Sequence, residues 1–282
     1  MAPSCYWRHS ARQRNPDLRS QRAKRDDVVA LDVQRIWHAN WQVYGADKVW
    51  LQMNREGKRV ARCTVERLMG RLGLQGVRRG KAMRTTMSVN SATCPLDRVN
   101  RVFKADRPNQ LWVSDFTYVS TWQGWLYVAF VIDVYARRIV GWRVSRNMQT
   151  DFVLDALEQA LFERQPAAND LIHHSDRGAQ YVSIRYTERL DQAGIKPSVG
   201  SKGDSYDNAL AETINGLYKA ELIHRRGPWK NRESVELATL QWVHWFNHIR
   251  LLKTIGGIPP AEAEANYWRQ LATSHTSTEV LT

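Results

Sequence analysis

The chain has 282 residues, 43% of them hydrophobic, which is enough to bury a core and predicts one to three domains. No apolar run is long enough to span a bilayer, and the N-terminus MAPSCYWRHSARQRNP lacks the apolar stretch of a secretory signal. The three widely spaced cysteines, Cys5, Cys63 and Cys94, indicate neither a disulfide framework nor a zinc knuckle and fit a reducing cytoplasm.

The net charge of +13 is concentrated in the first third of the sequence. Residues 1–110 hold 23 Lys and Arg against 9 Asp and Glu, whereas residues 111–282 hold 18 against 19. Such an excess is typical of a polyanion-binding region joined to a neutral globular body. A solubilising, solvated surface is the alternative, but the one-sided distribution favours nucleic acid as the partner.

The first 25 residues are basic and poor in aliphatic side chains, so we expect an arm over residues 1–25 that is mobile without DNA. Hydrophobic side chains then recur at helical spacing in DDVVALDVQRIWHAN, YGADKVWLQMNREG and ARCTVERLMGRLGL. Three short helices with a tight break before the last predict a helix-turn-helix domain over residues 26–77. Contacts with phosphates or base edges are expected from the third helix, through Arg62, Arg67 and Arg71. Arginines exposed to water on an ordinary amphipathic helix are the alternative.

A basic linker is predicted over residues 78–107, and the sequence pattern changes at Asn109. Three β-rich stretches, NQLWVSDFTYVST, WLYVAFVIDVYARR and IVGWRVS, predict an antiparallel meander. They are followed in order by a helix (TDFVLDALEQALFER), a strand (DLIHHSDRG), a helix (YVSIRYTERLDQAG), an edge strand (KPSVGS) and a helix (DNALAETINGLYKAELI). This order predicts an α/β core with a mixed sheet over residues 108–225. Residues 226–282 are expected to add a long amphipathic helix to the core and to end in a polar tail.

Three acidic residues far apart in the sequence are candidates for one site. Asp115 lies within the first predicted strand, where aspartate is unfavourable, Asp176 ends the strand LIHHSD, and Glu212 lies on the last helix of the core. If the first and fourth strands are neighbours, the three carboxylates meet at one edge of the sheet. Each acid also has an ordinary explanation, as a strand-end residue, a turn former and a solvated helix residue, respectively.

Three carboxylates held together repel one another, so such a cluster requires a cation. Oxygen ligands without cysteine or histidine suit Mg²⁺ or Mn²⁺. Two such ions about 4 Å apart can hold the attacking and the leaving oxygen of an in-line phosphoryl displacement. This is the chemistry of cutting and joining a DNA backbone.

Between Asp176 and Glu212 stand 35 residues, which is the D-D-35-E spacing of transposases related to retroviral integrases. The surrounding segments LWVSDFTYVST, GWLYVAFVIDVYARRIVGW, HHSDRGAQY and SYDNALAETINGLYKAEL match this family too, as do APSCYW and the helix-turn-helix segments. Over nearly its whole length the chain therefore resembles the OrfB transposases of the bacterial insertion-sequence family numbered three, particularly the mycobacterial-type members.

The resemblance implies a ribonuclease-H-like core with a mixed five-stranded sheet and flanking helices. It implies that Asp115 and Asp176 bind one metal ion and that Asp115 and Glu212 bind the other. Lys219 matches a basic residue that the family places seven positions after the glutamate. Seven residues are about two helical turns, so Lys219 shares a face with Glu212 and can hold a DNA phosphate.

Other polar residues of these motifs have roles that the sequence leaves open. Asn208 and Tyr206 lie in the loop that faces DNA in the family, and Asn208 is equally suited to capping the helix. Asp133 falls outside the triad and is expected to be structural. One of His173 and His174 is expected to point towards the metal side, although a packed histidine is the commoner outcome.

The resulting hypothesis is a DDE transposase that hydrolyses double-stranded DNA at insertion-sequence ends and then joins the freed 3′-hydroxyl to target DNA. We expect a homo-oligomer on DNA, in the cytoplasm at the nucleoid, without a membrane partner. The chain starts near the beginning of OrfB and shows no leucine-zipper heptads, so an OrfA segment or an OrfA–OrfB fusion is an expected partner. Two alternatives remain, a catalytically silent DNA-binding regulator of the full transposase and a structure-selective nuclease on the same fold.

Overall fold

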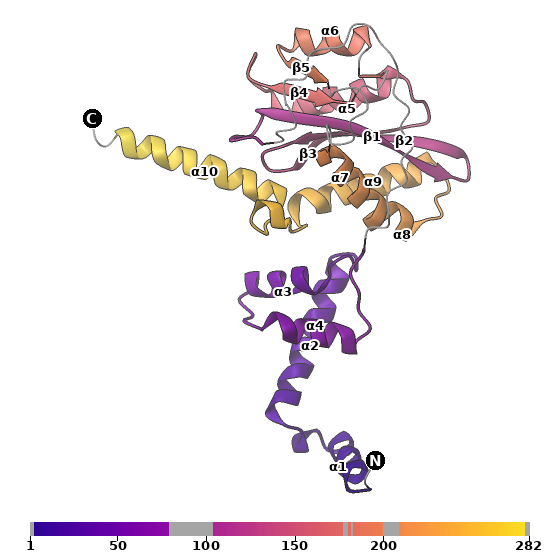
Figure 1. Ribbon diagram of the computed structural model, residues 1–282, viewed down its shortest axis with the longest axis vertical. Coiled ribbons are helices and arrows are strands. Elements are labelled where there is room, and N and C mark those ends of the chain that lie inside the picture. Colours follow the sequence, from indigo (N-terminus) through magenta and orange to yellow (C-terminus); the bar gives the residue numbers. More distant parts are fainter. Residues whose placement is uncertain (1–2, 79–103, 177–179, 182, 200–208, 280–282) are drawn as a thin grey trace. The chain divides into compact units, whose positions relative to one another are not determined.

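The computed structural model describes residues 3–78, 104–176, 180–181, 183–199 and 209–279 (Figure 1). The chain divides into two compact units, one within residues 1–78 and the other within residues 79–282. Most of the predicted linker, residues 79–103, lies outside the described residues, so the predicted domain boundaries stay predictions. None of the described helices is long and apolar enough to cross a membrane.

The first unit is helical, as the sequence predicts. Its elements are α1 (Pro3–Arg14), a 3-10 turn (Pro16–Leu18), α2 (Gln21–Ala39), α3 (Ala46–Arg55) and α4 (Arg62–Arg71). Helices α2, α3 and α4 bury a shared core, whose members include Val33, Ile36, Val49, Met53, Val65, Leu68 and Met69. The Ser20 hydroxyl caps α2 by accepting a hydrogen bond from the backbone N–H of Ala23 at 3.2 Å.

The predicted mobile arm is wrong in one respect, because most of residues 3–14 form the helix α1. This segment is rich in alanine, arginine and glutamine, which are good helix formers even where nothing is buried. No residue of α1 is buried, so the helix presents its basic side chains to solvent.

The second unit is a layered α/β fold, which confirms the predicted fold class. Its strands are β1 (Leu111–Thr121), β2 (Gly124–Asp133), β3 (Arg138–Ser145), β4 (Ile172–Ser175) and β5 (Lys196–Val199). Its helices are α5 (Thr150–Arg164), α6 (Ile184–Gln192), α7 (Ala209–Tyr218), α8 (His224–Arg226), α9 (Arg232–His248) and α10 (Pro260–Glu279), with a 3-10 turn at Lys253–Ile255. The sheet order is β3-β2-β1-β4-β5.

The pairing of the strands brings distant segments together. Strands β1, β2 and β3 form the predicted antiparallel meander, and β1 pairs with β4 in parallel from Leu111↔Ile172 to Ser114↔Ser175. The first and fourth strands are therefore neighbours, as the sequence predicts. Because β4 pairs with β1 only as far as Ser114, Asp115 and Asp176 are the next residues on their two strands.

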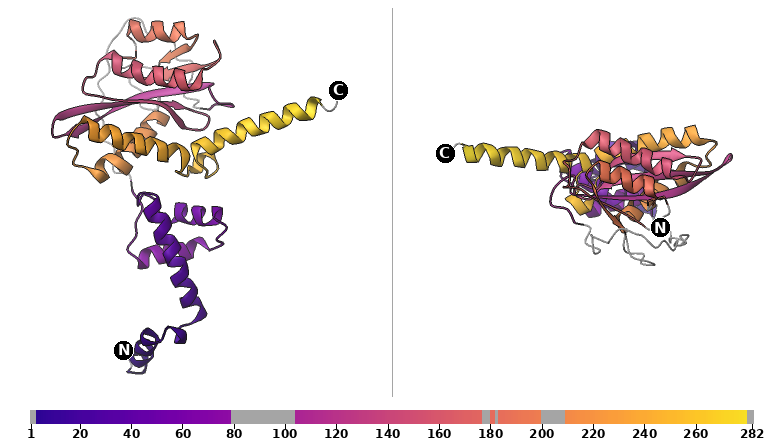
Figure 2. Two further views of the ribbon diagram at one scale, coloured as in Figure 1. Left: turned by 180° about the vertical axis from the view of Figure 1, so that it is seen from behind. Right: turned by 90° about the horizontal axis from the view of Figure 1, so that it is seen from above.

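Helices cover both faces of the sheet (Figures 1 and 2). On one face, α5 and α6 pack over a core that includes Trp112, Val131, Leu157 and Leu190. The approach of α5 to β3 is close, because a Cβ added at Gly141 would lie 2.1 Å from the carbonyl oxygen of Ala156. The fit of helix to sheet therefore depends on the absence of a side chain at Gly141.

On the other face, α7 and α9 enclose an aromatic cluster. The ring of Phe130 on β2 lies 5.1 Å from that of Tyr218 and 6.0 Å from that of Trp242. After Tyr218 the helix continues as a π-helical turn over Lys219–Ile223, whose buried Glu221 pairs with the buried Arg250 beyond α9. This ion pair fixes the end of the α7 segment to the end of α9.

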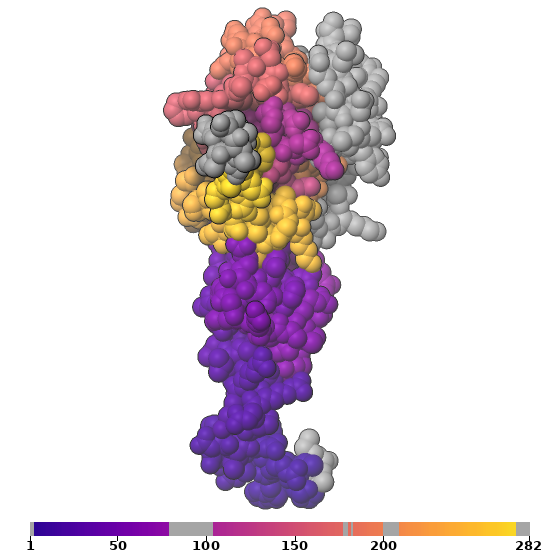
Figure 3. All heavy atoms as spheres, turned by 90° about the vertical axis from the view of Figure 1, so that its left-hand side faces the viewer, coloured from indigo at the N-terminus to yellow at the C-terminus, as the bar shows by residue number. Residues whose placement is uncertain are grey.

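The C-terminal segment also differs from the prediction, because the expected polar tail is the helix α10 (Figures 2 and 3). Pro260 at its first position and the sequence AEAEA favour a helix. Glu264 is buried and its carboxylate accepts a hydrogen bond from Arg138 at 2.8 Å and also pairs with Arg164. These pairs attach the start of α10 to the core.

Candidate active site

Asp115 is the centre of the candidate site. It lies on β1 opposite Phe130 of β2, on the face of the sheet that α7 covers. Its Oδ1 accepts a hydrogen bond from the backbone N–H of Phe116 at 2.8 Å, and its Oδ2 accepts one from Nδ2 of Asn215 at 2.9 Å. The carboxylate is thus held between its own strand and helix α7.

The charges around Asp115 show which acids share its surroundings. Burial raises the pKa of Asp115 well above its usual value, and the negative charges of Asp176 and Glu212 raise it further. The hydrogen bonds from Phe116 and Asn215 act in the opposite direction. The fold therefore brings all three predicted acids into one electrostatic neighbourhood, although they are up to 97 positions apart in the sequence.

The three acids are not closed around a common point. Among the described residues, no three His, Cys, Asp or Glu side chains are arranged so that they can hold a metal ion. Asp176 directly precedes residues 177–179 and Glu212, exposed in the first turn of α7, follows closely on residues 200–208; neither segment belongs to the described residues.

The chemistry of the donors nevertheless fits a hard divalent cation. The cluster offers carboxylate oxygens and an amide, without sulfur or imidazole, and Mg²⁺ and Mn²⁺ prefer such ligands. The raised pKa of Asp115 reports an excess of negative charge that a cation would relieve. Asp115, Asp176 and Glu212 are the residues that would hold it.

Lys219 lies on the same side of α7 as Glu212 and Asn215, since the three follow the i, i+3, i+7 spacing of one helical face. Its Nζ lies 4.3 Å from the centre of the Tyr118 ring on β1. This cation–π contact places the ammonium group next to the strand that carries Asp115.

The two histidines of β4 are packed residues. Nε2 of His173 lies 2.7 Å from the Ser114 hydroxyl and 3.2 Å from the Tyr186 hydroxyl, and burial lowers the pKa of His173 to about 3. Nδ1 of His174 lies 2.9 Å from the Ser198 hydroxyl. Because both are buried and bonded to hydroxyl groups, the expectation that one of them faces the metal side is wrong.

Asp133 is a buried residue at the end of β2. Its carboxylate accepts hydrogen bonds from the backbone N–H groups of Asn109 at 2.7 Å and Tyr135 at 2.9 Å. Burial raises the pKa of Asp133 to about 6. These contacts give Asp133 a role in closing the β2 turn.

The arginines predicted to contact DNA are engaged in ion pairs. Arg67 bonds both carboxylate oxygens of the buried Asp26 at 2.9 Å, and this hydrogen bond is the main cause of a lowered Asp26 pKa. Arg62 donates a hydrogen bond to Asp47 at 2.6 Å, and Arg71 lies 3.8 Å from Asp27. Contact of these arginines with DNA stays a prediction; Asn208 and Tyr206 lie outside the described residues.

Two residues of the site were missed in the sequence. Asn215 stands three positions after Glu212, on the same helical face, and that spacing was a usable signal. Tyr181 belongs to the segment HHSDRGAQY, and its hydroxyl is buried without a hydrogen-bond partner among the described residues. Burial raises the pKa of Tyr181, with smaller contributions from Tyr186, Asp115 and Asp176.

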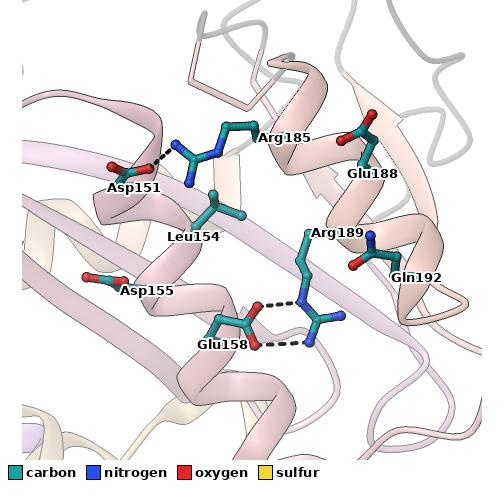
Figure 4. A pocket seen from close by; sticks show the side chains of 8 residues that line it. All are labelled: Asp151, Leu154, Asp155, Glu158, Arg185, Glu188, Arg189 and Gln192. Carbon is teal, nitrogen blue, oxygen red and sulfur yellow. Dashed lines mark hydrogen bonds and ion pairs between the residues drawn. The ribbon is translucent and has the colours of Figure 1, made fainter.

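A groove of about 520 Å³ between α5 and α6 contains none of the predicted site residues (Figure 4). Its charged side chains pair with one another, since Arg185 donates to Asp151 at 2.5 Å and Arg189 bonds both oxygens of Glu158. The candidate site therefore lies outside this groove, on the carboxylate cluster.

Comparisons with known proteins agree with this geometry. The chain matches models of the integrase core domain at residues 105–205 and 193–260, and of an HTH-like domain at residues 24–82. It is 60% identical to the transposase for insertion sequence element IS629 of Shigella sonnei over 96% of this chain and 90% of that protein. It is 57% identical to the putative transposase for IS986/IS6110 of Mycobacterium tuberculosis, over 96% and 97% of the two chains. The HTLV-2 integrase catalytic core domain in complex with magnesium covers 57% of this chain and 99% of its own, with 16% identity and a TM-score of 0.46.

Proposed function

Because the chain belongs to the insertion-sequence transposases of the family numbered three, together with those of IS629 and IS986/IS6110, we propose that it cuts and joins DNA strands at insertion-sequence ends through Asp115, Asp176 and Glu212. It is a transposase with an integrase core domain, an enzyme of the polynucleotidyl transferase type. The observation that carries the assignment of residues is the raised pKa of Asp115, to which Asp176 and Glu212 both contribute.

The cofactor in this proposal is a pair of Mg²⁺ or Mn²⁺ ions held by the three carboxylates. When bound, such ions activate the attacking oxygen and neutralise charge on the phosphate. Asp115 is the common ligand, and Asn215 and the Phe116 N–H fix the orientation of its carboxylate. Water attacks first at the element end, and the released 3′-hydroxyl then attacks the target strand without a covalent enzyme intermediate.

The other residues position the DNA. Lys219 binds a phosphate next to the carboxylates, and its contact with Tyr118 restricts the ammonium group to that place. The helix-turn-helix unit binds duplex DNA through α4, with Arg62, Arg67 and Arg71 exchanging carboxylate partners for phosphates, and Asn208 and Tyr206 contact the DNA near Glu212. The working form is a homo-oligomer on the DNA at the nucleoid, completed by an OrfA segment or an OrfA–OrfB fusion.

The test compares the wild-type chain with Glu212→Gln and Glu233→Gln. Glu233 is the matched control, because it is also an exposed glutamate in the first turn of a helix, α9. Each protein is incubated with labelled DNA that carries an element end, in Mg²⁺, Mn²⁺ or EDTA, and nicking, joining and binding are measured.

We expect wild type and Glu233→Gln to cut only with the divalent ion, and Glu212→Gln to bind the DNA without cutting it. Cleavage by Glu212→Gln at the wild-type rate would overturn the proposed role of this residue. If all three proteins bind and none cuts, the same assay with the OrfA–OrfB fusion separates an incomplete enzyme from a silent regulator. Cleavage of branched substrates in preference to element ends would indicate a structure-selective nuclease.

A further inference from the structure

The outer edge of β1 has an open stretch that begins at the candidate active site. Strand β4 pairs with this edge as far as Ser114, and the edge is paired again where Thr121 bridges to Trp229 and the Trp122 N–H donates to the Trp229 carbonyl at 3.0 Å. Between these points, no other described strand pairs with residues 115–120 on this side. We call residues 115–120 the open edge; Asp115 is its first residue and Trp122 lies just beyond its end.

Aromatic side chains stand along the far half of the open edge. Trp122 and Trp125 at the β1–β2 turn are 69% and 58% exposed, whereas large aromatic side chains are usually covered. The Trp125 ring lies 5.3 Å from that of Tyr118 in an edge-to-face arrangement, and Tyr118 in turn lies under the ammonium group of Lys219. The two exposed indoles thus continue a row that starts with Lys219 near the carboxylates.

A basic segment borders the same end of β1. The side chains of His224, Arg225, Arg226 and Lys230 are all exposed. Trp229 fixes this segment, because its backbone pairs with Trp122 and its Nε1 donates to the Ile223 carbonyl at 3.0 Å. Figures 1 and 2 show α8 beside the far end of the β1–β2 hairpin in both views. Cationic groups and exposed indoles therefore occur together at one place.

We propose that the open edge, Trp122, Trp125 and the basic segment 224–230 form a binding surface for an unpaired DNA strand that runs to the active site. Trp122 and Trp125 stack on bases, and Lys219 and the basic segment contact phosphates. The proposal rests on the proposed function in one point, since the bound strand is continuous with the strand at Asp115.

The chemistry favours an unpaired strand over a duplex. Indole rings can stack only on base faces that are not already stacked in a duplex, and aromatic side chains interleaved with cations are the usual platform for single strands. From Asp115 to Trp122 the strand advances seven residues, roughly 24 Å. That length corresponds to roughly seven phosphates of a stacked strand.

The test uses the full chain with the double variant Trp122→Ala/Trp125→Ala. The matched control is Trp268→Ala, which removes another exposed tryptophan from the same unit, on α10. Binding of a fluorescent oligo-dT of about 15 nucleotides, a length near the upper site sizes of single-strand platforms, and of a duplex of equal length is measured by anisotropy in EDTA. We expect the double variant to bind oligo-dT roughly 5- to 100-fold more weakly. Duplex binding should stay within about twofold, and Trp268→Ala should leave both unchanged.

Two further variants separate stacking from charge. Trp122→Phe/Trp125→Phe keeps an aromatic face and should recover most of the oligo-dT affinity. Arg225→Gln/Arg226→Gln should reduce the slope of log affinity against log salt by about 1.4, since each phosphate contact on a single strand contributes about 0.7.

Three results would overturn this proposal. They are unchanged oligo-dT binding by the alanine double variant, an equal loss for oligo-dT and duplex, or a change in oligomeric mass measured by light scattering, which would make the patch a contact between copies of the chain. The catalytic proposal is tested separately, because oligo-dT binding in EDTA requires no cleavage and Glu212→Gln should retain it.

Discussion

Asn215 donates a hydrogen bond of 2.9 Å from Nδ2 to Oδ2 of Asp115, and the Oδ1 of the same amide is buried without a hydrogen-bond partner. The side chain is therefore held in place by the carboxylate that it orients. Such an arrangement suits a residue that positions a metal ligand rather than one that reacts itself.

Replacing Asn215 by alanine should slow cleavage without preventing DNA binding. Removal of a residue that orients a ligand typically lowers activity or metal affinity about 10- to 100-fold. The cleavage rate should recover in part as the Mg²⁺ concentration rises, which a titration of rate against Mg²⁺ would detect. Asn266→Ala on α10 is the control. A wild-type rate for Asn215→Ala at low Mg²⁺ would contradict the positioning role.

Asp133 should make stability depend on pH. Its pKa is about 6 in the folded chain against 3.8 ordinarily, so the folded state holds this proton more tightly than the unfolded state. Its contribution to stability is therefore present below pH 4 and is lost as the pH rises through about 6. Asp133→Asn cannot titrate, so the wild-type unfolding free energy relative to this variant should fall between pH 4 and pH 7, by on the order of 3 kcal/mol. Urea unfolding at both pH values measures this; an equal difference at both would refute it.

The buried pair of Glu221 and Arg250 should show strong coupling between its members. Arg250→Met leaves an uncompensated buried carboxylate and should lower the unfolding free energy by about 3–5 kcal/mol. The double variant Glu221→Leu/Arg250→Met removes both charges and should recover most of that loss. A double-mutant cycle of urea unfolding measures the coupling. Additive losses would show that the two side chains do not depend on each other.

Two arginines of α4 should differ in their effects on stability and DNA binding. Arg67→Ala removes the partner of the buried Asp26 and should lower the unfolding free energy by about 1 kcal/mol. Arg62 lies at the surface with the exposed partner Asp47, so Arg62→Ala should change stability little. If Arg62 contacts a phosphate, the slope of log affinity for duplex DNA against log salt falls by about 0.9 in Arg62→Ala. An unchanged slope would remove Arg62 from the interface.

Gly141→Ala should destabilise the core, because the new Cβ would lie 2.1 Å from the Ala156 carbonyl and would separate α5 from β3. Overpacking of this kind costs about 1–3 kcal/mol. Gly70→Ala on α4 is the opposite case, since nothing lies within 4 Å of its added Cβ. That substitution should stabilise its helix by roughly 0.5–1 kcal/mol. Thermal unfolding of both variants compares the signs, and a stabilised Gly141→Ala would show that α5 can shift freely.

The strands and core helices were predictable because their hydrophobic patterns agree with their local propensities. The sequence of α5, for example, has the apolar spacing of a helix packed on a sheet, and its bounds match the prediction. Helices α1 and α10 were not predicted, because they bury little and a search for an apolar face overlooks such helices. Local propensity alone would have revealed them.

The candidate site was predictable only in part. The spacing of Asp115, Asp176 and Glu212 identified the acids, and the parallel pairing of β1 with β4 explains their neighbourhood. The hydrogen bond from Asn215 could not be deduced, because it depends on how α7 packs against β1. Nor could the ion pairs of Arg62, Arg67 and Arg71, since their acidic partners lie on other helices.

The π-helical turn after Tyr218 sets the rotational phase between the two halves of one continuous helical segment. Residues before the turn keep Glu212 and Asn215 aligned with Asp115, while the wider turn directs Glu221 to Arg250. Deleting one residue from this turn would restore α-helical geometry and rotate everything that follows by about 100° relative to Glu212. The number of residues between the catalytic glutamate and the basic segment 224–230 is therefore a mechanical setting, and it determines which way the arginines face when Glu212 is in place.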